Sequence, residues 1–187
     1  ETENQLQILL CELAAYLHNK DMEINVWDRI IAFEGRMHEF IKAAYDYQDN
    51  TFHSHPGYYI DYFEMRLAQL QVLHNLHYEI KKIRKMPKQA LVIADYIMYM
   101  ADYVVEMNIP DQQIEKLEEI SEQMKQEELP KTREEFEGRA LLYHILMDLE
   151  EFLVYKKRFV NGLDEKKLRI YWKQEMEQKD SANELQK

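Results

Sequence analysis

Apolar residues recur every three or four positions through most of the chain, and this spacing constrains its fold more than any other feature. The pattern first appears from Leu6 to Leu17 and returns in further runs up to about residue 159. Such spacing places apolar side chains on one face of an α-helix. No segment alternates as a half-buried strand does, and only four Gly and four Pro supply turn residues. The sequence therefore predicts an all-α fold.

Breaks between the apolar runs predict where each helix begins and ends. Pro87 and Pro110 suit the first turn of a helix, Thr132-x-x-Glu135 forms a capping box, and Asn161-Gly162 is a stop signal. The predicted helices cover residues 6–17, 24–47, 59–83, 88–107, 111–126, 136–159 and 164–179, with a loop at 49–57. Long helices joined by short connections favour an antiparallel helical bundle of about six or seven helices.

We expect residues 1–187 to form a single helical bundle domain. Its core would lie within residues 6–160, and residues 161–187 would add a short helix and a polar tail. A chain of 187 residues, 46% of them hydrophobic, is long enough for one sizeable core. Because the chain starts at Glu1 rather than Met, we interpret it as a fragment of a larger protein.

The charge of the chain argues against nucleic acid as a partner. The formal net charge is −11, and residues 106–137 hold eleven carboxylates against four Lys and Arg. Such a surface repels phosphate backbones.

Cys11 is the only cysteine, so no internal disulfide can form, which fits a cytoplasmic location. The apolar stretch 90–109 contains Asp95, Asp102 and Glu106, too many charges for a bilayer span.

Histidine spacing gives little support to a metal centre. A di-iron bundle needs Glu three residues before His on two helices, and no His here meets that condition. His74-x-x-His77 and His53-x-His55 could each lend two ligands to zinc, but two ligands are not a complete site. No cofactor is predicted, and a metal-dependent helical-bundle enzyme stays only as an alternative.

Acid–base chemistry has two candidate pairs. Glu34 and His38 share a helix face, as do His144 and Asp148, so a carboxylate could orient each imidazole. The same spacing arises routinely in ordinary surface pairs. No nucleophile elbow, glycine-rich phosphate loop or zincin helix accompanies them. The sequence favours a protein that is not an enzyme.

Thirteen tyrosines offer a different possibility. Tyr58, Tyr59 and Tyr62 begin one helix, and Tyr96, Tyr99 and Tyr103 share another. They could line a groove for a flat apolar ligand, since each ring has an apolar body and a polar tip. The favoured alternative is that they pack in the core with their hydroxyls at its rim.

Two segments together resemble a known bacterial family. Tyr62-Phe63-Glu64-Met65-Arg66 with Gln69 resembles Tyr-Phe-x-Met-Arg-x-x-Gln. Residues 129–140, followed by 148–153, resemble Leu-Pro-x-Thr-Arg-Glu-Glu-Phe-Glu-Asn-Arg-Ala and Asp-Leu-Glu-Glu-Phe-Leu, except that Gly138 stands where Asn is expected. Both are similar to the C-terminal domain of the "putative aromatic acid exporter" family, and the likeness covers about residues 6–159.

The resemblance implies a cytoplasmic domain that follows an N-terminal transmembrane domain in a membrane exporter. It would lie on the cytoplasmic side of the bacterial membrane, with its own transmembrane domain as a partner, and it could form a homo-oligomer. Its role would be accessory, in regulation or assembly. The resemblance brings no catalytic or ligand residues with it.

An alternative role is sensing of a small aromatic acid. The ligand-binding candidates are then Arg66 and Arg139, with Tyr62 and Tyr99 as aromatic neighbours. The favoured reading of the same charges is structural: ion pairs, among them Arg66 with Glu150, would fix the register of the helices.

Overall fold

The structure, a computed structural model, describes residues 1–19, 25–50 and 56–172. These residues form seven helices and no strand, which confirms the predicted all-α class. The helices are α1 (Thr2–His18), α2 (Val26–Asn50), α3 (Pro56–Lys82), α4 (Ala90–Ala101), α5 (Asp111–Gln126), α6 (Arg133–Asn161) and α7 (Glu165–Tyr171). None of the described helices is long and apolar enough to cross a membrane.

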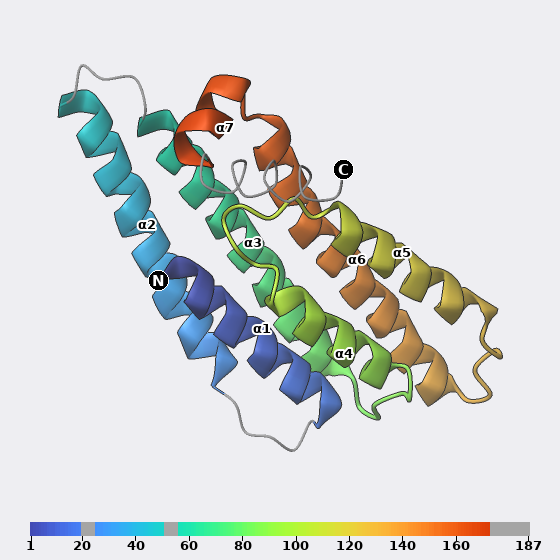
Figure 1. Ribbon diagram of the computed structural model, residues 1–187. Coiled ribbons are helices and arrows are strands. Elements are labelled where there is room, and N and C mark those ends of the chain that lie inside the picture. The colour runs from blue at the N-terminus through green and yellow to red at the C-terminus, as the bar shows by residue number, and fades with distance from the viewer. Residues whose placement is uncertain (20–24, 51–55, 173–187) are drawn as a thin grey trace, which may run out of the picture.

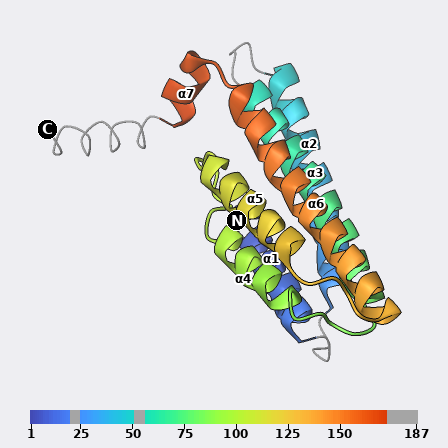
Figure 2. The same cartoon turned by 90° about the vertical axis from the view of Figure 1, so that its right-hand side faces the viewer.

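The helices lie in two layers, and successive long helices run in opposite directions (Figure 1). α2, α3 and α6 form one layer, with α3 packed against both neighbours. α1, α4 and α5 form the second layer, and α7 sits beyond one end of the bundle (Figure 2). α1 packs on α4 within its layer, and α5 also packs against α6 across the two layers. The structure is thus the antiparallel bundle that the sequence predicts.

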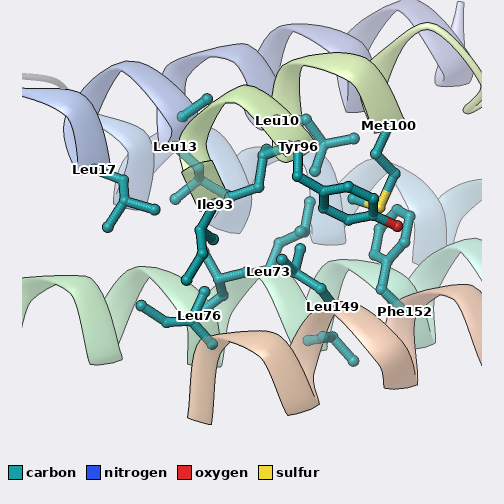
Figure 3. Close-up of a cluster of buried hydrophobic side chains, with 14 of the residues drawn as sticks. Leu10, Leu13, Leu17, Leu73, Leu76, Ile93, Tyr96, Met100, Leu149 and Phe152 are labelled. Atoms are coloured by element: carbon teal, nitrogen blue, oxygen red, sulfur yellow. The ribbon is translucent and has the colours of Figure 1, made fainter. Parts of the chain in front are cut away.

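The main core lies between the two layers. Figure 3 shows side chains of α1 and α4 meeting side chains of α3 and α6. The residues labelled there are all buried, at 2% exposure or less: Leu10, Leu13, Leu17, Leu73, Leu76, Ile93, Tyr96, Met100, Leu149 and Phe152. They follow the three- and four-residue spacing of the sequence, because each helix turns one stripe toward the other layer.

α4 is shorter than predicted: it covers Ala90–Ala101 instead of 88–107. The amides of Asp102, Tyr103 and Val104 each bond to the carbonyl three residues earlier, which tightens the last turn and ends the helix. Val104 is nevertheless buried at 4% exposure. The apolar pattern therefore continues past the helix because the connection at 102–110 also packs against the bundle.

Two other predicted boundaries differ in detail. The expected loop at 49–57 is narrower, since α2 extends to Asn50 and α3 begins at Pro56, where a proline needs no helical hydrogen-bond donor. The last helix is described only as Glu165–Tyr171, and the remainder of the predicted span to residue 179 lies outside the described residues.

The capping box at the start of α6 forms as predicted, with one change. The Thr132 hydroxyl accepts from the Glu135 amide at 3.1 Å. The carboxylate of Glu135 reaches back to the amide of Lys131 at 2.9 Å, one residue before the expected donor. The backbone bond at Lys131 lowers the pKa of Glu135, with Arg139 acting in the same direction.

Candidate functional site

A cluster of buried polar side chains interrupts the apolar interior. One of its members is Arg66 on α3. The side chain of Arg66 is only 1% exposed. Its Nη1 donates to Oε1 of Gln69 at 2.9 Å, and Nε2 of Gln69 donates to the Phe152 carbonyl on α6 at 2.8 Å. Three residues separate Arg66 from Gln69, so the helix itself brings the two side chains together. Gln69 thereby ties a buried charge to the neighbouring helix.

The other two nitrogens of the Arg66 guanidinium, Nε and Nη2, have fewer stabilising contacts than Nη1. Its centre lies 5.0 Å from the ring centroid of Tyr62, a cation–π contact. The nearest carboxylate in an ion pair is that of Glu3, whose Oε1 lies 3.9 Å from Nη2 and which is about a third exposed. The Nε and Nη2 donors are fully buried and have no hydrogen-bond partner. A buried cation with two unused donors is costly, and this is the least satisfied group of the cluster.

Lys156 of α6 is the second buried cation. It is 4% exposed, and its ammonium donates to the backbone carbonyl of Glu106. The carboxylate of Glu106 accepts from the Tyr58 hydroxyl at 2.5 Å, and the same hydroxyl accepts from Nε1 of Trp172 at 3.0 Å. Burial and the bond to Glu106 raise the pKa of Tyr58. These bonds hold the 102–110 connection against α3, α6 and the end of α7.

α5 closes the cluster from the other layer. The Tyr96 hydroxyl donates to the Gln113 carbonyl at 2.6 Å, and Asn108 Nδ2 donates to Gln113 Oε1 at 3.1 Å. Gln113 Nε2 in turn donates to the Tyr99 hydroxyl at 3.3 Å. Gln113 is 1% exposed, so its amide is used almost entirely within the protein. Burial raises the pKa of Tyr96, which therefore stays protonated as a donor.

Some of these side chains line a very small cavity. Its volume is about 10 Å³, and its walls come from α3, α6, the start of α5 and the 102–110 connection. The polar lining residues are Arg66, Gln69, Tyr103, Asn108, Gln113 and Lys156. A volume of this size holds about one water-sized group. The cavity in this form is too small for an aromatic ring.

The four predicted ligand residues do not form one site. Tyr62 and Arg66 lie in contact, whereas Tyr99 joins the cluster from the other layer, through Gln113 and the ring of Tyr103. Arg139 lies near the start of α6, thirteen residues before Phe152, or about 20 Å along the helix axis. There it donates to Glu135 at 2.9 Å and to the Glu128 carbonyl at 2.5 Å. Arg139 anchors the connection before α6.

The predicted ion pair between Arg66 and Glu150 is wrong. Glu150 is exposed and lines a groove between α5 and α6. The face of α6 toward α3 carries Phe152 and Lys156 instead, and Glu150 lies about 200° around the helix from Phe152. Charged residues of the signature do form two ion pairs within α6: Arg133 with Glu137 and Arg139 with Glu135, each at 2.9 Å.

Sequence reasoning missed Lys156, Gln113 and Glu106. Lys156 belongs to a basic run that suggests favourable charges at a helix end, but α6 continues to Asn161. The burial of Lys156 could have been predicted from its position, four residues after Phe152 and three before Phe159 on the buried face of the helix. Gln113 likewise lies on the buried stripe of α5, four residues before Leu117.

The histidine pairs do not assemble a metal centre in the part of the chain that is described. No group of three His, Cys, Asp or Glu side chains lies close enough to hold an ion among those residues. His74 packs edge-on against Trp27, and His77 stacks on Tyr16. Burial lowers the pKa of His77, with the charge of Lys81 adding to the effect. His53 and His55 lie outside the described residues.

Of the two predicted acid–base pairs, only the pair of His144 and Asp148 contains a carboxyl with a raised pKa. Burial, followed by the charges of Glu79 on α3 and Glu151 on the same helix, raises the pKa of Asp148 to about 6. The charge of His144 acts in the opposite direction. Oδ2 of Asp148 is buried and has no hydrogen-bond partner. His38, in the other pair, is exposed.

A groove of about 300 Å³ lies between α5 and α6. Its apolar residues include Met147, which is 64% exposed, together with Leu117 and Leu146. Glu118 and Glu122 also line it, and Lys125 pairs with Glu122 at 2.5 Å. The tyrosines that the sequence offered for such a groove do not line it. Tyr58, Tyr62 and Tyr96 are buried, as in the packing alternative, whereas Tyr59 and Tyr103 are exposed.

Comparison with known proteins decides the family. The model of the "Putative aromatic acid exporter C-terminal domain" matches residues 1–157 of the chain. The chain belongs to this family. The match confirms the resemblance seen in the two sequence segments, and it covers α1 to most of α6.

The chain is also similar to two further proteins. The uncharacterized protein YqjA of Bacillus subtilis (strain 168) is 32% identical over 98 residues, which are 52% of this chain and 30% of that protein. The match therefore spans about a third of the relative's length. The crystal structure of a putative membrane protein from Clostridium difficile 630 superposes with a TM-score of 0.74 at 24% identity, covering 84% of this chain and 94% of that one. At this identity the likeness shows the shared fold.

Proposed function

We propose that this domain is a cytoplasmic accessory domain of a membrane exporter of aromatic acids and that it regulates or assembles the transporter. The observation that carries the proposal is the family match over residues 1–157. The fold gives it support, because most buried side chains form an ordinary apolar core. Charged groups such as Arg133, Arg139 and Glu137 stabilise helices locally. The proposed partner is the exporter's own transmembrane domain, and self-association is one route to assembly.

Sensing of an aromatic acid is the second candidate function. It is favoured by the unused donors of buried Arg66 beside the ring of Tyr62. An aromatic acid does not fit the cavity of about 10 Å³, so the 102–110 connection would have to move aside. Calorimetry with a panel of aromatic acids tests this function, and no binding at millimolar concentrations would count against it.

The cytoplasmic location can be tested by chemical labelling. Cys11 is the only cysteine, so Cys11→Ala with Met147→Cys leaves a single exposed thiol in the domain. In cells that make the whole exporter, this thiol is expected to react with a membrane-impermeant maleimide only after lysis. Labelling of intact cells at the same rate would contradict the location.

The assembly role can be tested by removing the domain. The exporter without residues 1–187 is expected to insert its spans but to change its number of subunits, measured by mass photometry in detergent. A matched control retains the domain and carries Gly35→Ala, a change at a position with open space around it. If the shortened protein keeps the subunit number of the control, the domain does not act in assembly.

A further inference from the structure

The groove between α5 and α6 has an apolar floor that solvent reaches. The two helices pack side by side and run in opposite directions (Figure 1). The apolar lining residues are Ile114 and Leu117 on α5 and Tyr143, Leu146 and Met147 on α6. On each helix they are three or four positions apart, so they lie in a line along the helix axis. The floor therefore follows the two helices, and Met147, 64% exposed, is its most accessible side chain.

The length of the floor suits a partner helix. On α5 the lining residues run from Ile114 to Lys125, a rise of about 16 Å or three helical turns. On α6 the apolar line continues outside the groove to Phe136, which is 61% exposed and precedes Tyr143 by close to two turns. A helix laid along this floor can place its own apolar side chains on it at spacings of three and four.

The edge of the groove is acidic. Glu118 and Glu122 on α5 and Glu150 on α6 line it, and all three are exposed. Among the described residues that line the groove, Lys125 is the one cation, and it pairs with Glu122 at 2.5 Å. Glu118 and Glu150 are left as two negative charges without an ion pair in the described part of the chain.

Two further lysines on these helices contact other groups. Lys116 lies 3.8 Å from the ring centroid of Tyr99, and Lys157 pairs with Asp111 at 2.9 Å. α5 as a whole carries five carboxylates against two lysines. The groove thus lies in a negative field that its own side chains do not neutralise.

Charge decides between the possible occupants of this face. A second copy that met it with the same face would place carboxylates opposite carboxylates, and an anionic lipid surface would be repelled in the same way. A helix with Lys or Arg on both sides of an apolar stripe has the complementary pattern. Such a helix gains from burial of apolar surface on the floor and from opposite charges at the edge.

We infer that the α5–α6 groove reversibly docks a basic amphipathic helix of a partner protein. The apolar side chains of that helix pack on Leu117, Tyr143 and Met147, and its Lys or Arg side chains lie beside Glu118 and Glu150. Methionine suits such a surface, because its flexible side chain adapts to the shape of a partner. The inference concerns the chemistry of the partner and is independent of the proposed transport role.

The first test uses a fluorescein-labelled peptide of about 14 residues, long enough to span the groove as a helix. It consists of Leu and Lys, with Leu at spacings of three and four. A second peptide has the same composition with Leu and Lys alternating, and a third has Glu in place of Lys. Each is titrated with the 187-residue chain and followed by fluorescence anisotropy.

The helical Leu–Lys peptide is expected to bind, the alternating peptide to bind about tenfold more weakly, and the Leu–Glu peptide not to bind. The difference between the first two arises because only the helical pattern puts every Leu on one face. Equal affinities of these two peptides would show that charge alone attracts them and would overturn the inference. Absence of binding by the helical Leu–Lys peptide would overturn it as well.

Met147→Gln tests the floor without changing the charge. It is expected to weaken binding of the helical Leu–Lys peptide about fivefold, because an apolar contact is lost. Met98→Gln, at a position 47% exposed on α4, is the matched control and should bind like the wild type. Equal affinities of the two variants would contradict the site. A free chain that dimerises in sedimentation velocity, and that Met147→Gln returns to the monomer, would instead make a second copy the occupant and overturn the inference.

A pair of double variants tests the edge. Glu118→Gln with Glu150→Gln removes two carboxylates from the groove. The control, Glu39→Gln with Asp95→Asn, removes two exposed carboxylates from α2 and α4, so both proteins have the same net charge. The first protein is expected to bind the helical Leu–Lys peptide about fivefold more weakly than the control, an effect typical of two exposed ion pairs. The same affinity in both would assign the attraction to overall charge and contradict the site.

Nuclear magnetic resonance of methionine methyl groups locates the peptide on the wild-type chain. With ¹³C-labelled methyl groups, the helical Leu–Lys peptide should shift the signal of Met147 and leave that of Met98 in place. Each signal is assigned by its absence from the spectrum of the corresponding Gln variant. An unchanged Met147 signal at saturating peptide would overturn the inference.

Discussion

Single buried charges in this domain differ in how well their surroundings compensate them. Arg139 donates to two acceptors and leaves only Nε unused, whereas Arg66 donates to one and leaves Nε and Nη2 unused. Asp148 has a buried oxygen that accepts no hydrogen bond. The last two therefore cost stability that a change of conditions or of side chain should reveal. Removing Gln69, which accepts from Arg66, should expose the first cost, and a change of pH should expose the second.

Asp148→Asn is expected to stabilise the domain near neutral pH. The folded pKa of about 6 lies above the ordinary value of 3.8, so the contribution of Asp148 is most favourable below pH 4 and is lost as the pH rises through 6. The full shift is discounted because water screens this half-buried carboxyl, which leaves about 1 kcal/mol at pH 7. Urea unfolding of both proteins at pH 4 and pH 7 measures the difference.

The gain should vanish near pH 4, where the wild-type carboxyl is already protonated in the folded state. Asp95→Asn, at an exposed position of α4, serves as the control and should change stability little at either pH. A variant at Asp148 that is less stable than the wild type at pH 7 would show that the charged form is favourable there.

Gln69→Ala is expected to destabilise the domain by about 1–3 kcal/mol, because Arg66 Nη1 loses its acceptor while remaining buried. The control is Gln71→Ala, an exposed glutamine two residues along the same helix. Chemical denaturation measures the free energy of unfolding of both variants. If both variants lose the same small amount of this free energy, the bridge that Gln69 makes between Arg66 and Phe152 contributes little to stability.

At the scale of whole elements, the contact between α6 and the connection before α4 depends on a glycine. A Cβ atom at position 138 would lie 2.9 Å from Cγ of Pro87 and 3.3 Å from the Lys85 carbonyl oxygen. Neither a proline ring nor a backbone carbonyl moves easily. Gly138, which stands where the family signature has Asn, thus lets the two segments approach closely.

Gly138→Ala should destabilise the domain although alanine favours helix. The intrinsic gain of about 1 kcal/mol is opposed by about 1–3 kcal/mol of overpacking, so we expect a net loss of about 1 kcal/mol. Gly35→Ala on α2 has open space and should show the gain alone. Thermal unfolding midpoints give both values, and a stabilised Gly138→Ala variant would mean that the Pro87 segment shifts at little cost.

Helix boundaries could be predicted from sequence where they depend on neighbouring residues, and not where they depend on packing. The capping box and the prolines marked the starts of helices, because these depend on neighbouring residues. The early end of α4 at Ala101 was not visible, since Val104 continues the apolar pattern while packing from a turn.

At the scale of the molecule, periodicity predicted which face of each helix is buried but not which helix covers it. The pairing of α3 with α6 and of α1 with α4 is long-range, and so the cluster of Arg66, Lys156 and Gln113 could not be assembled from sequence. Arg66 and Tyr62 lie four residues apart on one helix, so their contact follows from sequence spacing. Arg139 shares only its residue type with Arg66, and it lies elsewhere.

The proposed role of the domain is to control a transporter of aromatic acids. The most direct measurement is the efflux rate of an aromatic acid per inserted exporter, with and without residues 1–187, because regulation and assembly both act on this rate. We predict a change of about fivefold or more when the domain is removed, within the range of typical coupling between sites. An unchanged efflux rate per inserted exporter would contradict the claim.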